Sequence, residues 1–187
     1  MRIHALLPLA GILTCFGIAC TPQQPAEKPA AFNTTVTIRE IMQSMVAPEA
    51  DVLWNAVSSS VTDKGVEEKA PKNDEEWARV RHEAITLAEA TNLILMSGRH
   101  VAKPGEKAED PKVQLSPEQI EALINQDKES WTKFSHGLRD ATMVAVQAID
   151  AKNAEALSNA GDGIDKACET CHLKYWYPNE AKQGQKQ

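Results

Sequence analysis

Residues 153–178, NAEALSNAGDGIDKACETCHLKYWYP, determine how the rest of this chain is interpreted. Within them, the five residues from Cys168 to His172 form the pattern C-x-x-C-H, which is the covalent attachment site of a c-type haem. The two thiols form thioethers with the porphyrin, and the adjacent imidazole binds the iron. In a helix the cysteines lie at i and i+3 and the histidine at i+4, and therefore on one face. The sequence predicts one covalent haem c, held by Cys168, Cys171 and His172.

Other interpretations of the cysteine pair explain less. A closed structural zinc site needs four nitrogen or sulfur ligands, but the remaining cysteines, Cys15 and Cys20, lie in the N-terminal leader. A thioredoxin-like redox pair needs a βαβ context. A disulfide across two intervening residues would be strained and would leave His172 without a role.

The same stretch has the pattern of one long amphipathic helix. Asn153 is a suitable N-cap residue, and Pro178 ends the helix. The positions that share one face are apolar or small, namely Leu157, Gly161, Ile164, Cys168, Cys171 and Tyr175. The predicted attachment residues therefore continue the buried face of the last helix.

Two more helices have clear start signals. One begins after Asn73, with acidic residues in its first turn, and stops at Gly98. The other begins at the capping box that starts with Ser116 and has proline at its first helical position. Its apolar spacing continues to residue 150, and whether it breaks within 125–128 stays open.

The first helical stretch contains a proline. Apolar residues recur at helical spacing from Ile38 to Val57, but Pro48 stands between them. Proline inside a helix removes a hydrogen bond and bends the axis, so we expect this helix to be kinked or split near Pro48.

No stretch has the pattern of a strand. The connections 62–72 and 99–115 are charged and contain proline or glycine, and we expect them to be surface loops. The predicted fold class is all-α, an antiparallel four-helix bundle with a covalent haem on the C-terminal helix.

The two ends of the chain differ from the middle. Residues 1–20 have a short basic start and an apolar core, the pattern of a secretory signal peptide. Cys20 follows a small residue, so lipoprotein processing with a lipid anchor on Cys20 and plain cleavage both stay open. Residues 21–34 are predicted to be a flexible tether, residues 35–178 the folded domain and residues 179–187 a polar tail. We expect a periplasmic protein, either free or anchored as a lipoprotein.

The charge limits the kinds of partner. The formal net charge is −6, which argues against nucleic acid and favours partners with basic patches. No hydrolytic triad, phosphate loop or pair of catalytic carboxylates is present, so we do not expect an enzyme.

A family resemblance follows from these features. The C-terminal C-x-x-C-H, the Tyr175-Trp176-Tyr177-Pro178 that follows it, and Arg39 with the methionines of the first helix are similar to the class II c-type cytochromes, the cytochrome c prime and cytochrome c-556 group. The resemblance covers about residues 35–178 and implies a four-helix bundle. The departure is Pro48, which interrupts what is usually a regular first helix.

The sixth iron ligand decides between the two branches of that group. In the c-556 branch a first-helix methionine binds the iron, which implies a one-electron carrier. Met42 is the preferred candidate here and Met45 the alternative, because both lie in the expected segment. The cytochrome c prime branch has no such ligand and implies NO or CO binding. Three histidines are rival ligands, His82, His100 and His136, and each is more simply a surface residue.

The partners expected for a carrier are redox proteins. A homodimer stays open, as does a role as one subunit of a larger redox complex.

Overall fold

The computed structural model describes residues 32–179. This part of the chain is mostly helical, with one small two-stranded sheet. The predicted signal peptide 1–20, the tether 21–34 except for its last three residues, and the tail 179–187 except for Asn179 lie outside the described residues. Within the described residues, no helix has both the length and the apolar character needed to span a membrane.

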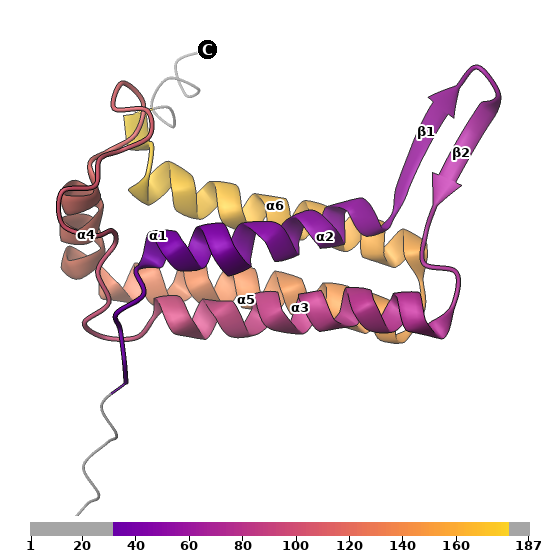
Figure 1. Ribbon diagram of the computed structural model, residues 1–187, viewed down its shortest axis with the longest axis horizontal. Coiled ribbons are helices and arrows are strands. Elements are labelled where there is room, and N and C mark those ends of the chain that lie inside the picture. The colour runs from indigo at the N-terminus through magenta and orange to yellow at the C-terminus, as the bar shows by residue number, and fades with distance from the viewer. Residues whose placement is uncertain (1–31, 180–187) are drawn as a thin grey trace, which may run out of the picture. The chain divides into compact units, whose positions relative to one another are not determined.

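Four long helical segments run side by side, and successive segments point in opposite directions (Figure 1). The first consists of α1 (Ile38–Ile41), a π-helical turn η1 (Met42–Val46) and α2 (Ala47–Ala56); the others are α3 (Asp74–Ile94), α5 (Lys128–Asp150) and α6 (Ala154–Tyr175). Contacts connect α2 to α3, α3 to α5, α5 to α6 and α6 back to α2. The short helix α4 (Pro117–Gln126) packs across one end, against α5 and α6.

The predicted helix starts are confirmed. The side chains of Asn73, Ser116 and Asn153 each accept a hydrogen bond from a backbone N–H three residues later, which satisfies a donor that the helix itself leaves unpaired. The region 117–150 does break. Asp127 ends α4, and its carboxylate caps α5 by accepting from the N–H of Ser130 at 3.0 Å.

The first helix is interrupted before Pro48 rather than at it. The N–H of Ala47 donates to the carbonyl of Met42, five residues back, where an α-helix would use the fourth. Pro48 has no N–H, and in a regular α-helix its ring collides with the carbonyl four residues earlier. The wider turn of η1 lets the chain continue into α2, so the predicted interruption takes the form of a π-helical turn and not of two separate helices.

The expectation of no strands was wrong. Residues 58–69, which overlap the predicted loop 62–72, form an antiparallel hairpin of β1 (Ser58–Thr62) and β2 (Gly65–Lys69) that projects away from the helices (Figure 1). Val61 pairs with Val66, and these side chains are 86% and 64% exposed. The sequence has no alternating apolar pattern here because neither face of the hairpin is buried.

Tyr175 anchors the end of α6 in the core. It is fully buried, and its ring meets Trp131 and Phe134 of α5 edge-on, with centroid distances of 5.3 and 6.0 Å. Such T-shaped pairs are favourable beyond the area they bury. The last turn of α6 is therefore fixed against α5 just after His172.

Asp127 also joins two helices and gives the fold a pH dependence. Its carboxylate accepts from Nζ of Lys174 on α6 at 2.7 Å. This bond, together with the N–H of Ser130, lowers the pKa of Asp127 from 3.8 to about 2. Because the pKa is lower in the folded state, the stabilisation is complete above the unfolded value and disappears as the pH falls through about 2.

We expect Asp127→Asn to be less stable than the wild type at neutral pH, and the difference to shrink between about pH 4 and pH 2. Urea unfolding at a series of pH values measures this. A difference that stays constant over that range would contradict the assignment.

Candidate functional site

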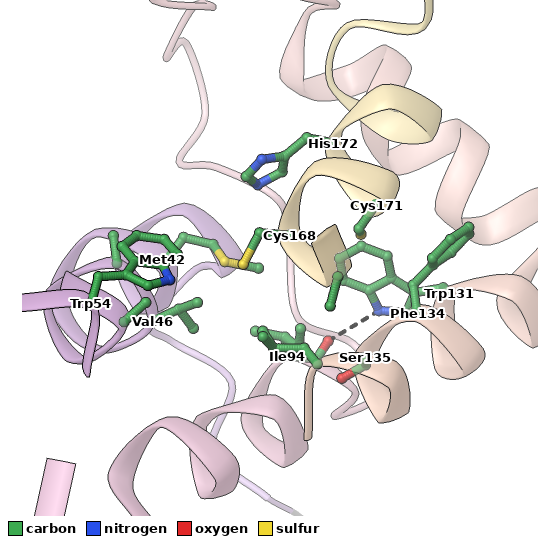
Figure 2. A pocket seen from close by; sticks show the side chains of 14 residues that line it. Met42, Val46, Trp54, Ile94, Trp131, Phe134, Ser135, Cys168, Cys171 and His172 are labelled. Atoms are coloured by element: carbon green, nitrogen blue, oxygen red, sulfur yellow. Dashed lines mark hydrogen bonds between the residues drawn. The ribbon is translucent and has the colours of Figure 1, made fainter. Parts of the chain in front are cut away.

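A cavity of about 150 Å³ lies between η1 and α2 on one side and α5 and α6 on the other. Its wall is almost entirely apolar. Lining residues come from η1 and α2 (Met42, Val46, Ala47, Ala50, Trp54), α3 (Ile94), α5 (Trp131, Phe134, Ser135, Leu138) and α6 (Ala167, Cys168, Cys171, His172) (Figure 2).

The polar groups of the wall that belong to α5 are already bonded. The indole N–H of Trp131 donates to the carbonyl of Ile94 at 3.3 Å, and the hydroxyl of Ser135 donates to the carbonyl of Thr91 at 2.8 Å. Among the described residues, no buried side-chain nitrogen or oxygen lacks a partner. The cavity is therefore suited to an apolar ligand that needs no hydrogen bonds from these groups.

Both predicted cysteines lie on the α6 wall of this cavity. Cys168 and Cys171 are half-buried and are not joined by a disulfide. Burial raises the pKa of the Cys168 thiol to about 11 and that of Cys171 to about 12, because the charged thiolate is poorly solvated there. At neutral pH both side chains are therefore thiols, and neither is poised as a thiolate nucleophile.

His172 lines the same cavity from the next position on α6. Burial lowers its pKa, while the nearby Glu169 acts in the opposite direction, and the imidazole is therefore neutral at neutral pH. A neutral imidazole has a nitrogen lone pair that can bind a metal. The rings of Trp176 and Tyr177 lie beside it, with centroids 6.0 and 5.8 Å away, and the Tyr177 hydroxyl donates to Glu169 at 2.8 Å.

Of the two candidate methionines, only Met42 lines the cavity. Figure 2 shows its side chain reaching from η1 toward the side of α6 that carries Cys168 and His172. Met45 packs against the core but is not part of the cavity wall.

The rival histidines also lie elsewhere. His82 and His100 are exposed, and His136 is half-buried on α5 but does not line the cavity. His100 is paired with Glu121 at 2.9 Å. Arg39, which the sequence analysis singled out, forms an ion pair with Glu106 at 3.5 Å.

The two thiols and the imidazole are the donor set that a covalently attached porphyrin would need. In the described residues, no three His, Cys, Asp or Glu side chains form a group that could hold a metal ion by themselves. Two thiols and one imidazole are instead spread along one helix face that borders an apolar cavity. Two attachment points and one iron ligand need this spacing, since the vinyl groups and the iron are separate parts of a haem.

The sequence did not single out Trp54, which is a large part of the wall. Met42, Val46, Ala50 and Trp54 follow at intervals of four residues. In an α-helix, four residues make about 40° more than one full turn. Residues spaced by four therefore drift around the helix, and this spacing alone does not predict a common face over twelve residues. The wider turn of η1 offsets part of that rotation.

No family model, curated protein or solved structure matches this chain.

Proposed function

We propose that this chain is a monohaem c-type cytochrome of the class II type, a four-helix bundle that carries single electrons in the periplasm. One observation supports this most: Cys168, Cys171 and His172 border an apolar cavity that Met42 lines from another helix. The C-x-x-C-H pattern indicates haem c as the cofactor. The apolar cavity beside it would give that haem an environment poor in water.

The chain's own residues have distinct roles in this proposal. Cys168 and Cys171 would hold the group covalently, and His172 would be the proximal ligand. Trp131, Phe134 and Leu138 line the cavity and would keep water from the group, and Tyr175 fixes the turn of α6 that carries His172. A haem bound there supplies an iron that changes its charge by one electron.

The position of Met42 on the cavity wall favours an electron carrier over a gas-binding protein. A thioether ligand keeps the iron six-coordinate and raises the reduction potential, and Met42 is the described methionine that lines the cavity. A five-coordinate, NO- or CO-binding protein is the alternative if Met42 does not bind the iron. The negative net charge supports a redox partner with a basic surface.

The proposal is tested on the full chain, expressed in a bacterium with a working cytochrome c maturation apparatus. A thiol adds across a vinyl group without loss of atoms, so the denatured protein should be heavier than the apoprotein by one whole haem. Cys168→Ser/Cys171→Ser is the matched control and should have the apoprotein mass. A wild-type protein that also has the apoprotein mass would refute the proposal.

A further inference from the structure

Trp54 lies between the cavity and an outer groove. Its side chain lines the cavity that contains Cys168 and His172, and it also lines an outer groove formed by α2 and α6. Among the described residues it is the one that belongs to both walls. Trp54 is 37% exposed, so part of the residue is accessible from outside.

A hydrogen bond and a glycine hold this ring in place. The indole N–H of Trp54 donates to the carbonyl of Gly161 on α6 at 3.1 Å. A Cβ atom at position 161 would lie only 3.2 Å from Cδ1 of Trp54, closer than most such contacts. Glycine is unfavourable inside a helix by about 1 kcal/mol relative to alanine, and close seating of the indole gives a physical reason for glycine here.

We propose that Trp54, seated on Gly161, determines the size of the ligands that can reach the cavity from the outer groove. This inference rests on the proposed function, because the ligands in question are those that bind a haem iron. Trp54 is a specificity residue of the wall and not a ligand itself. Asp162 and Asp165 also line the groove, so neutral probes are needed to measure size alone.

The test compares a small and a large neutral ligand on the oxidised holoprotein. Imidazole and 4-phenylimidazole are titrated at mildly alkaline pH, and the readout is the ratio of their affinities. Any cost of displacing Met42 is common to both ligands and cancels in this ratio. We expect Trp54→Ala to shift the ratio toward 4-phenylimidazole by about tenfold or more, the scale of a steric change in an apolar pocket. Trp54→Phe keeps a ring but loses the hydrogen bond, and should shift it less.

Gly161→Ala tests whether the close contact between position 161 and the indole of Trp54 holds the ring in place. Alanine favours the helical conformation more than glycine does, so this change is not expected to unfold the protein. It should shift the ratio in the same direction as Trp54→Ala, and should have no further effect in the Trp54→Ala background. Gly163→Ala is the matched control on the same helix, because its Cβ would meet Ala141 at an ordinary 3.9 Å. An unchanged ratio in Trp54→Ala, or equal shifts in Gly161→Ala and Gly163→Ala, would overturn the inference.

A second readout separates this inference from the proposed function. If the purified chain carries no haem, the Cys168 and Cys171 thiols on the cavity wall are the probes, and their reaction rates with N-methylmaleimide and N-phenylmaleimide are compared. The same variants should raise the relative rate of the larger reagent. Unchanged relative rates would refute the inference that Trp54 selects ligands by size. Absence of haem with the expected change in relative rates would refute only the proposed cytochrome function.

Discussion

Replacing Met42 with alanine is expected to convert the oxidised protein from a low-spin to a high-spin form. Met42 lines the cavity beside Cys168 and His172, and alanine has no atom that can bind iron. The absorption spectrum should lose the weak red band of methionine-bound ferric haem, and the reduced form should gain the ability to bind CO. The reduction potential should fall, since a thioether ligand raises it.

Met45→Ala is the matched control for this experiment. Met45 is also a half-buried methionine of η1, but it does not line the cavity, so its loss should leave the spectrum unchanged. A Met42→Ala protein that stays low-spin would assign the sixth position to Met45 or to a histidine. A wild-type protein that is already high-spin would favour the gas-binding alternative.

Replacing Tyr175 with alanine is expected to lower the free energy of unfolding by about 3–5 kcal/mol, the usual cost of removing a buried aromatic ring. Tyr175 is fully buried and meets two rings of α5, so alanine would leave a cavity and remove both contacts. For a domain of this size the midpoint of thermal unfolding should fall by roughly 10 °C or more. Circular dichroism during heating measures this.

Tyr175→Phe separates the ring from its hydroxyl. The hydroxyl makes one long hydrogen bond, 3.4 Å to the carbonyl of Asp127, so we expect its removal to cost no more than about 1 kcal/mol. Equal losses in the two variants would show that the hydroxyl, and not the packing of the ring, holds the end of α6.

Local signals predicted most of the helices. Asn73, Ser116 and Asn153 are side chains that pair a backbone N–H within three residues, so the sequence alone contains both partners. The spacing of Cys168, Cys171 and Tyr175 predicted which face of α6 turns inward, because helical periodicity is also local.

Features that depend on tertiary contacts were not predicted. The hairpin 58–69 has no buried face, and without one the period of two that identifies a strand is absent. Pro48 predicted an interruption, but not that a π-helical turn would absorb it and bring Trp54 to the same wall as Met42. Whether the stretch 117–150 breaks stayed open, because Asp127 at the break also pairs with Lys174, 47 residues away, and no local pattern contains that contact.

The projecting hairpin has an energetic consequence for the link between α2 and α3. The entropy lost on closing a loop grows only slowly with its length, by about 0.6 kcal/mol for each doubling. A connection half as long would therefore change the cost of pairing α2 with α3 by little more than thermal energy. Because β1 and β2 bury almost nothing, the length and content of this link can vary while the helices around the cavity keep their packing.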